Sequence, residues 1–452
     1  TIERRIEDDI GEMPWPPGLF GELCQDIYNM SRFQYKEIAI VTGLGLVAGI
    51  CGRRFNISGT GLNLYMTLIM NTGMGKDQIA SFITRILLEL NESGKSSSFI
   101  GKKNHHSAKA LVKEIIEARS QVVVCTESGL ADASKVGDRT GLRKEMLDIY
   151  TKSGSKEYLN GTAYSSVEDN IPTIRSPALT IINETTPAKA LKNYQQMESM
   201  QGGDLPRQSI FRFTGDKPYP NVDIQAEVST AVLEKLKHLI HKCAPVQMTD
   251  DPLAYHMDPA KGSDVWKDMI ANDRYWIDYQ NEHKYDDSTR AMMASRTHVK
   301  TLKMAGLCSV FNHKDEETKM PEWAWAKQMG VYEIDGADQF FNEEGGTLEL
   351  MVREQIAPLI LNILNNHYKS PKQQVDAIMR KKGWVTYSAI LQVARSRSKI
   401  KEFNDTDGQR GIPMSGLDKG LFLMKKQGTI KDVSSASTPT IVITEAFRSI
   451  YE

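Results

Sequence analysis

The sequence predicts an α/β protein with a parallel β-sheet core, flanking helical regions and a small C-terminal domain. Residues 62–218 alternate apolar runs of strand length with segments of helical periodicity, which is typical of a parallel sheet. A glycine loop joins the first of these strands to the first of these helices. Residues 370–452 instead show helical patterns followed by a two-strand pattern, which indicates a separate domain.

The bulk composition limits the function classes. The 452 residues suffice for two or three domains, and 40% hydrophobic and 25% charged residues are ordinary for a soluble globular protein. A net charge of -1 argues against a uniformly basic coat for nucleic acid. Five scattered cysteines indicate reduced thiols, and no apolar run reaches the roughly 20 residues of a membrane span. We expect a cytoplasmic protein without a membrane partner; its start at Thr1 fits a fragment or a processed chain.

Four segments are expected along the chain. Residues 1–54 would form an N-terminal arm and helices, and residues 55–220 the α/β core. Residues 221–365 would form a helical region packed on that core, followed by the C-terminal domain, 366–452. The last segment holds 15 Lys and Arg against 8 Asp and Glu, a charge of about +7, whereas the rest of the chain carries about -8. This contrast supports the last boundary.

The loop Asn71–Lys76 carries the strongest functional pattern. It follows the apolar run Leu64–Met70 and precedes a helical pattern, Gln78–Leu90. A strand, a glycine loop ending in Gly-Lys and a helix form the layout of a P-loop, where backbone amides and a helix N-terminus attract phosphate. Lys76 would reach the β- and γ-phosphates of ATP. The expected nucleotide-binding residues are Thr72, Gly73, Met74, Gly75, Lys76, Asp77 and Gln78.

Two positions depart from the usual pattern G-x-x-x-x-G-K-[ST]. Met70 stands where the first glycine belongs, and Asp77 replaces the hydroxyl residue that normally holds Mg²⁺. A carboxylate can also bind Mg²⁺, because this ion prefers oxygen ligands. We therefore expect ATP and Mg²⁺ as cofactors, with Asp77 as a metal ligand. The alternative is a plain glycine turn between a core strand and a helix.

A second strand pattern, residues 121–125, leads to the acid Glu127. In P-loop ATPases the Walker B strand delivers carboxylates to Mg²⁺ and to the attacking water at this place. Glu127 is therefore expected to bind the metal and to orient or deprotonate water. Thr126 stands where the first acid of that motif is usual. The alternative is an acid at the end of an ordinary strand.

Two further residues complete the expected catalytic set. Asn183 lies at the end of a third apolar strand and could sense the γ-phosphate; alternatively it starts the turn before Pro187. Arg207 follows the Gly202-Gly203 pair and could act as an arginine finger on a neighbouring subunit, because guanidinium is always charged and matches phosphate geometry. Arg212 is the second candidate, and a surface arginine is the alternative.

Together these residues resemble the phage- and prophage-encoded P-loop ATPases found fused to, or beside, primase domains. The resemblance covers roughly residues 14 to 330. It rests on Gly61–Tyr65, the Gly73/Gly75/Lys76 loop, Glu127–Gly129, Thr185–Pro187, Gly202–Arg207 and a helical stretch with Arg296, Lys303, Ala305 and Gly306. It implies a RecA-like, hexamer-forming ATPase that works on DNA during replication in the bacterial host cytoplasm, with a primase among the candidate partners.

The C-terminal domain has the pattern of a winged helix. Helices are expected over 371–382, 386–395 and 413–427, and strands over 429–433 and 440–444. Such domains place one helix in the major groove of DNA and the wing on the backbone. The expected phosphate contacts are Arg395, Arg397, Lys419, Lys425, Lys426 and Lys431. The alternative is a protein–protein module with solvated lysines.

The sequence favours an ATP-dependent DNA replication motor, a helicase or helicase-like initiator of a phage or mobile element. ATP would be hydrolysed between subunits of a homo-oligomeric, hexameric ring. Lys152 and Lys156 lie between the second and third predicted strands, where ring helicases hold pore loops for single-stranded DNA; a plain basic loop is the alternative. The alternative function is a non-catalytic DNA-binding scaffold or loader with a degenerate P-loop.

Overall fold

The structure is a computed structural model with two compact units, Thr1–Phe341 and Asn342–Glu452. The described residues are 12–91, 95–102, 105, 107–125, 139–163, 170–187, 189–190, 203–282, 289–313, 317–343, 356–367, 374–395, 427–433 and 439–451, with a few single positions between them.

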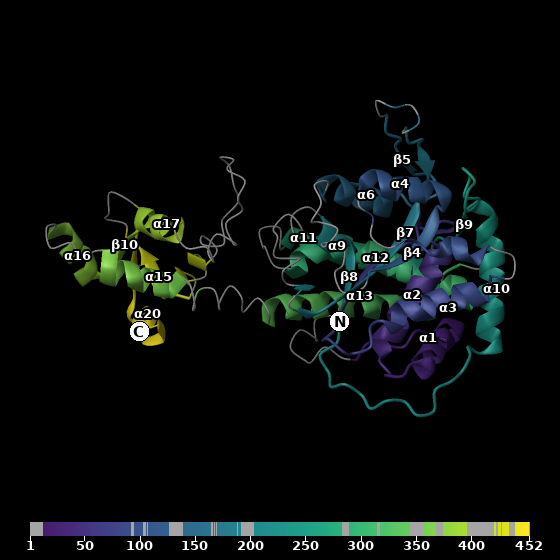
Figure 1. Cartoon of the computed structure of the whole chain (residues 1–452), viewed down its shortest axis with the longest axis horizontal. Coiled ribbons are helices and arrows are strands. Elements are labelled where there is room, and N and C mark those ends of the chain that lie inside the picture. The colour runs from purple at the N-terminus through teal and green to yellow at the C-terminus, as the bar shows by residue number, and fades with distance from the viewer. Residues whose placement is uncertain are drawn as a thin grey trace. The chain divides into compact units, whose positions relative to one another are not determined.

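The first unit is built on a four-stranded parallel sheet with the strand order β4-β7-β3-β8. Strands β4, β7 and β8 are labelled in Figure 1. Its strands are β3 (Tyr65–Ile69), β4 (Ser120–Cys125), β7 (Ala178–Thr185) and β8 (Gln208–Arg212). A parallel bridge between Ile100 and Val122 extends the sheet beyond β4. The strands are almost wholly buried, as expected of a parallel sheet that helices cover on both faces. The predicted α/β class with a parallel sheet is confirmed.

One face of the sheet is covered by α2 (Lys36–Cys51) and α3 (Gln78–Glu89), with α1 (Gly18–Met30) and α10 (Thr230–Cys243) packed outside α2. Helix α2 is buried on nearly all sides, which explains its apolar sequence. Gly45 allows its close approach, since a Cβ there would lie 2.3 Å from Cδ1 of Ile182 in β7. Gly52, just after α2, lies beside Ala178 at the amino end of β7. The N-terminus of α2 therefore points toward the carboxyl edge of the sheet.

The opposite face is covered by α4 (Ala108–Glu117) and α6 (Arg139–Thr151). Both helices contribute to an apolar cluster with the sheet, in which Leu111 and Met146 pack near Tyr65 and Val123. The Tyr65 hydroxyl donates to the carbonyl oxygen of Met146 at 2.7 Å, so the strand that precedes the glycine loop is anchored to α6.

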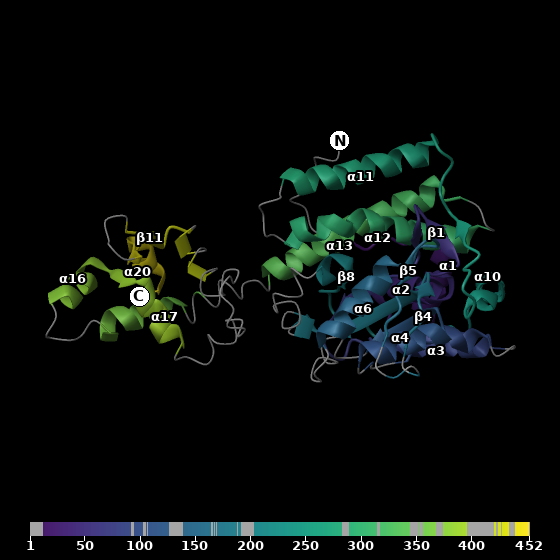
Figure 2. The ribbon, with the colours of Figure 1, turned by 90° about the horizontal axis from the view of Figure 1, so that it is seen from above.

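Three long helices pack on the β8 side of the sheet (Figure 2). They are α11 (Asp264–Glu282), α12 (Thr289–Asn312) and α13 (Met320–Glu343). Two buried lysines of α12 join this layer to the sheet: Lys300 donates to the carbonyl oxygen of Gln208 at 3.0 Å, and Lys303 to that of Asn63 at 3.1 Å. Helix α12 and the earlier helix α10 both belong to residues 221–365, the region that the sequence predicted to be helical.

Smaller elements complete the first unit. They are β1 (Phe55–Ile57), β2 (Thr60–Gly61), η1 (Ser96–Phe99), β5 (Tyr158–Leu159), β6 (Ile174–Arg175), α9 (Asp204–Arg207), η4 (Ala244–Val246) and β9 (Tyr255–His256). Strands β2, β1 and β9 form one small sheet, and β5 pairs with β6. Among the helices that the structure describes, none combines the length and the apolar character needed to cross a bilayer.

The second unit combines short helices with a three-stranded antiparallel sheet of order β10-β12-β11. Its elements are α15 (Ala357–Asn362), η6 (Ile363–His367), α16 (Gln374–Lys382), β10 (Trp384–Thr386), α17 (Tyr387–Arg395), β11 (Ile430–Asp432), β12 (Thr440–Ile443) and α20 (Glu445–Tyr451). The two strands expected over 429–433 and 440–444 are present as β11 and β12. The helix expected over 413–427 lies largely outside the described residues.

The second unit begins earlier than the sequence suggested. Residues 356–364 were assigned to the helical region packed on the α/β core, but α15 and η6 share a separate apolar core with β10, α17 and β12. The apolar side chains of this segment, such as Leu359 and Ile363, pack near Val385 and Ile390 there. The physical boundary between the two cores thus lies near residue 342 and not at 366.

Candidate phosphate-binding site

The glycine loop lies at the carboxyl edge of the parallel sheet, between the end of β3 and the start of α3. Gly73 and Gly75 have φ angles of 78° and 82°, a left-handed backbone that glycine adopts without strain. The two turns leave residues 71–73 exposed to solvent while Met74 is buried. The predicted succession of strand, glycine loop and helix is therefore present.

The Lys76 side chain folds back over the ends of two strands. Its ammonium group donates to the carbonyl oxygens of Met70 at 2.7 Å and Thr185 at 2.9 Å, and a third carbonyl, of Asn71, lies at 3.5 Å. Carbonyl groups carry only partial charges, so these contacts position the ammonium group without neutralising it. The Lys76 ammonium group is thus held beside an exposed turn of backbone.

The start of α3 supplies the second attraction for an anion. The helix has twelve residues, and its first amides follow directly after Lys76. Asp77 is exposed and makes no capping hydrogen bond, so its carboxylate faces solvent. Gln78 stabilises the loop, because its Nε2 donates to the carbonyl oxygen of Gly75 at 3.0 Å. The predicted residues from Thr72 to Gln78 therefore lie together between the end of β3 and the first residue of α3.

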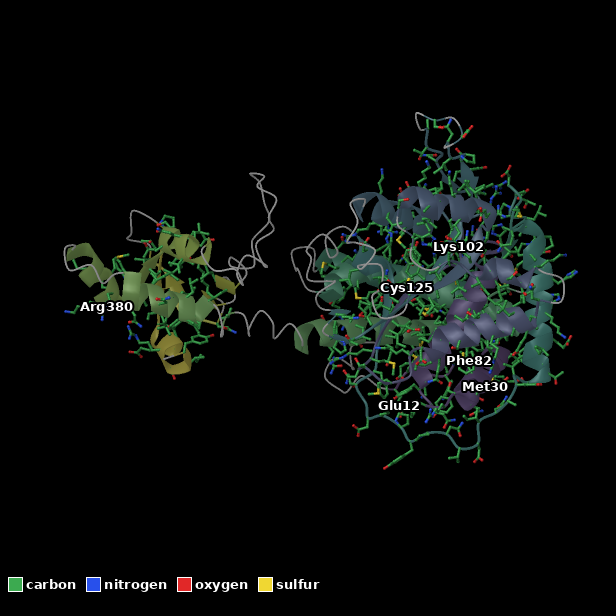
Figure 3. The ribbon with its side chains drawn as sticks, viewed as in Figure 1. Glu12, Met30, Phe82, Lys102, Cys125 and Arg380 are labelled. Carbon is green, nitrogen blue, oxygen red and sulfur yellow. The ribbon has the colours of Figure 1, made fainter. Side chains whose placement is uncertain are left out.

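The strands that carry the predicted catalytic residues do not follow β3 across the sheet in the order of the sequence. Strand β7 lies between β3 and β4, and Asn183 pairs in register with Thr67 of β3 and Cys125 of β4. The Asn183 side chain is buried, and its Oδ1 has no hydrogen-bond partner among the described residues. Glu127 lies outside the described residues, two positions after Cys125, which is labelled in Figure 3.

Glu184 is a candidate that the sequence did not indicate. The strand was expected to finish at Asn183, whereas β7 continues to Thr185. Side chains alternate along a strand, so Glu184 shares with Ile182 the face that α2 and α3 cover. It pairs in register with Leu68 and is 3% exposed. A carboxyl group in a buried strand, one residue before the carbonyl that holds Lys76, is the signal that could have identified it.

Arg207 lies at the amino end of β8, on the sheet edge opposite Lys76. It donates to the carbonyl oxygen of Gly203 at 2.7 Å and to Thr151 Oγ1 at 3.4 Å, and burial followed by the nearby Arg296 charge lowers its pKa. Within one chain Arg207 is therefore remote from the loop, and a finger role requires a second copy. Arg212 lies at the other end of β8, paired with Ile69, with its guanidinium 5.4 Å from the Phe340 ring.

Two segments that carry none of the predicted site residues also contact the loop. The Tyr35 hydroxyl lies 2.9 Å from Met74 Sδ, and Lys217 Nζ donates to the carbonyl oxygen of Gly73 at 2.7 Å. Tyr35 precedes α2, and Lys217 follows β8, so residues far apart in sequence meet at the loop. No local pattern in the sequence indicates these contacts.

The basic turn at residues 152–156 is compact. Lys152 forms an ion pair with Glu157 at 2.7 Å, and residues 153–155 are buried, with the amide of Ser155 donating to Asn56 Oδ1 at 2.7 Å. Lys156 is exposed. Of the two cations predicted to contact single-stranded DNA, one is thus paired within the chain and one faces solvent.

The C-terminal unit contains basic residues that the sequence predicted as phosphate contacts and others that it did not. Lys431 is exposed and Lys425 pairs with Asp432 at 2.8 Å, while Arg395 belongs to the last turn of α17. Arg397, Lys419 and Lys426 lie outside the described residues. The sequence did not indicate the exposed run Arg380, Lys381 and Lys382 at the end of α16; Arg380 is labelled in Figure 3.

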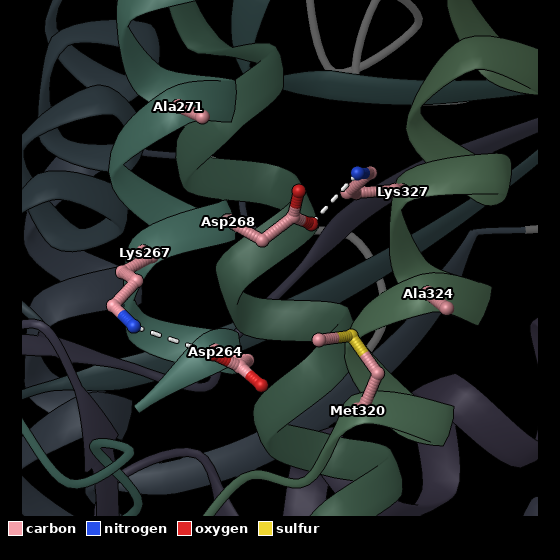
Figure 4. Close-up of a pocket in the computed structure, with 7 residues that line it drawn as sticks. All are labelled: Asp264, Lys267, Asp268, Ala271, Met320, Ala324 and Lys327. Atoms are coloured by element: carbon pink, nitrogen blue, oxygen red, sulfur yellow. Dashed lines mark hydrogen bonds and ion pairs between the residues drawn. The ribbon is translucent and has the colours of Figure 1, made fainter. Parts of the chain in front are cut away.

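A groove of about 550 Å³ lies between α11 and α13 (Figure 4). Its charged side chains pair with one another: Lys327 with Asp268 at 2.7 Å, and Lys267 with Asp264 at 3.4 Å. It contains none of the predicted site residues. Within the described parts of the chain, no group of three or more His, Cys, Asp and Glu side chains is placed to hold a metal ion.

Comparison with protein families and with curated proteins gave no match, since no family model fits the chain and no curated protein is sufficiently similar. The functional interpretation therefore rests on the residues and their geometry.

Proposed function

We propose that this chain is a P-loop ATPase that acts on DNA as a replication motor, a helicase or helicase-like initiator of a phage or mobile element. The observation that carries the proposal is the position of Lys76. Its ammonium group stands at the carboxyl edge of a parallel sheet, after two left-handed glycines and directly before a helix N-terminus. Ligands of open α/β sheets bind at this edge.

ATP would bind with its β- and γ-phosphates on the loop amides and the Lys76 ammonium group. The ammonium group would exchange its carbonyl partners for phosphate oxygens, a stronger interaction because both partners are ionised. Asp77 and Glu127 are the proposed Mg²⁺ ligands, and Asn183 the proposed γ-phosphate sensor. Glu127 would orient the attacking water, and the buried Glu184 is a second candidate for this role.

The DNA-binding part of the proposal is supported by the second unit. Two antiparallel strands, β11 and β12, form a hairpin, and β12 also pairs with β10, which precedes α17. A hairpin beside a short helix with exposed lysines nearby is the arrangement expected of a winged helix that contacts phosphates. Assembly into a hexameric ring would bring Arg207 of one copy toward Lys76 of the next.

ATP binding by the full chain and by Lys76→Ala tests the proposal. The parent should bind ATP with Mg²⁺ and hydrolyse it faster with single-stranded DNA. Lys76→Ala should lose ATP binding because the ammonium group that contacts the phosphates is removed. Lys261→Ala, at an exposed lysine of another surface loop, is the matched control and should bind like the parent. Equal ATP binding by the parent and Lys76→Ala would refute the phosphate site.

A non-catalytic DNA-binding scaffold is the second candidate function. The specific observation in its favour is Asp77, a carboxylate at the position where a hydroxyl group normally holds Mg²⁺ beside the phosphates. The scaffold would bind DNA with similar affinity in the presence and absence of ATP and would show no turnover. The same assay, read for hydrolysis with and without DNA, separates the two functions.

A further inference from the structure

An aromatic side chain lies against the glycine loop at Gly75. Phe33, between α1 and α2, is partly exposed, and its Cδ2 lies 3.4 Å from the place where a Cβ on Gly75 would be. Gly75 therefore lets the ring approach the loop backbone. Lys76 extends toward Met70 and Thr185 at the strand ends, whereas Phe33 lies where the loop enters α3.

Buried side chains near Phe33 fix the position of its backbone. Tyr35 is buried, its ring packs edge-on against that of Phe213 at 5.0 Å, and its hydroxyl contacts Met74 Sδ. Met74 is itself buried in the apolar core that α2 and α3 share. The backbone that carries Phe33 is thus attached to the loop by buried side chains, so the ring is held at a defined place beside Gly75.

Two cations flank the Phe33 ring. Lys217 Nζ lies 4.2 Å from the ring centre and also donates to the exposed Gly73 carbonyl at 2.7 Å, and the Arg32 guanidinium lies 5.5 Å from the ring centre. Cations at these distances are attracted to the ring face. Lys217 and Arg32 are both exposed, so their present contacts can be exchanged for those of a ligand. The loop therefore has two kinds of chemistry along it: an aromatic ring with cations beside Gly73 and Gly75, and the ammonium group of Lys76.

We infer that Phe33 is the stacking platform for the base of a nucleoside polyphosphate, and that Lys217 is a second phosphate-binding cation. This inference rests on the proposed ATP-binding function of the loop. The base would take the place of the Lys217 ammonium group over the ring, and this ammonium group would move from the ring and the Gly73 carbonyl to a phosphate oxygen. A ligand with an aromatic base at one end and phosphates at the other would span the loop from Phe33 to Lys76. An inorganic polyphosphate would fill only the cationic part.

Calorimetric titration of the full chain with ATP and with inorganic tripolyphosphate tests this assignment. Phe33→Ala and Phe33→Leu should weaken ATP binding about 5- to 150-fold, the usual contribution of one base stacked on an aromatic side chain, and leave tripolyphosphate binding unchanged. Phe33→Tyr should bind ATP like the parent because it keeps the ring. Lys217→Ala should weaken both ligands, while the matched control Lys261→Ala should weaken neither. Thermal unfolding checks that each variant is folded.

The possible outcomes distinguish a failure of this inference from a failure of the proposed ATP-binding function. If the parent binds both ligands and Phe33→Leu binds ATP as tightly as the parent, Phe33 is not the platform and the inference is wrong. Equal weakening of both ligands by Phe33→Leu would also overturn it, since the ring would then act only on the shape of the loop. If the parent binds neither ligand, the proposed ATP site itself fails.

Discussion

The ammonium group of Lys76 lies 2.9 Å from the carbonyl oxygen of Thr185, so the glycine loop is tied to the end of β7. This contact exists because β7 lies between β3 and β4. The residues at the end of β7 are therefore closer in the sheet to the loop strand than those that follow β4. Glu184 and Thr185 occupy the place next to the glycine loop.

We expect Glu184→Gln to retain ATP binding and to lower ATP turnover about 100-fold or more, the usual contribution of a general base. The substitution preserves the shape of the side chain and removes its ability to accept a proton. Steady-state turnover and ATP affinity would be measured beside Glu127→Gln, which should bind ATP and trap the ATP-bound assembly. Normal turnover in Glu184→Gln, with loss in Glu127→Gln, would assign Glu184 a structural role.

Asp77→Ser restores the hydroxyl group of the usual P-loop pattern. If Asp77 serves as a substitute ligand for Mg²⁺, this variant should keep or raise Mg²⁺-dependent turnover. Its unfolding free energy should change by no more than about 0.5 kcal/mol, because the exposed Asp77 carboxylate makes no capping hydrogen bond. Turnover as a function of Mg²⁺ concentration measures the effect. A large loss of activity would show that the carboxylate has a dedicated task that a hydroxyl group cannot replace.

Lys303 should make the stability of the first unit depend on pH. Burial, followed by the charges of Arg296 and Arg207, lowers its pKa well below the ordinary 10.5. Between that lowered value and 10.5 the unfolded chain binds more protons than the folded chain, so stability should rise with pH across this window. The stability gained in this window should be lost as pH falls through the folded-state pKa of Lys303.

Lys303→Met tests this linkage because it removes the titrating group and keeps the length of the side chain. The unfolding free energy of the parent minus that of the variant should increase from about pH 7 to about pH 10, as measured by urea unfolding at each pH. Lys261→Met, at an exposed position, supplies the comparison. A difference that stays constant over this range would mean that the Lys303 ammonium group is not destabilised by its surroundings.

Residues 342–452 should fold alone, since their apolar core is separate from that of the first unit. The fragment should bind duplex DNA with an affinity that falls as salt rises, with a log–log slope of about -0.9 for each phosphate contact. Lys431→Ala and Lys381→Ala should each make the slope about one contact shallower if both lysines contact phosphate. A salt-independent interaction would instead favour a protein–protein module.

Local patterns were sufficient for the strands and helices around the loop. The apolar runs before Lys76, before Glu127 and around Asn183 are β3, β4 and β7, and the periodic segment after Lys76 is α3. What they could not supply is the strand order, because the insertion of β7 between β3 and β4 depends on pairing between distant segments. For the same reason β7 was expected to end too early, and Glu184 was overlooked.

The contacts of Phe33 and Lys217 were beyond sequence reasoning for a related reason. Their ring and ammonium group meet across more than 180 positions of the chain, and neither belongs to a recognised motif. In the second unit, β10 has only three residues and exists through its pairing with β12, so no periodicity could indicate it. Local propensity determines isolated elements, whereas a site assembled from several segments depends on the tertiary fold.

The location of Arg207 at the amino edge of the sheet, with Lys76 at the carboxyl edge, has a consequence for symmetry. A two-fold dimer would complete two sites at once, because Arg207 of each copy would meet Lys76 of the other across one shared surface. Head-to-tail association uses two different surfaces, and it either closes into a ring or continues as a helical filament. An open filament would leave one Arg207 and one glycine loop without a neighbour at its two ends, whereas every closed assembly would complete all of its sites.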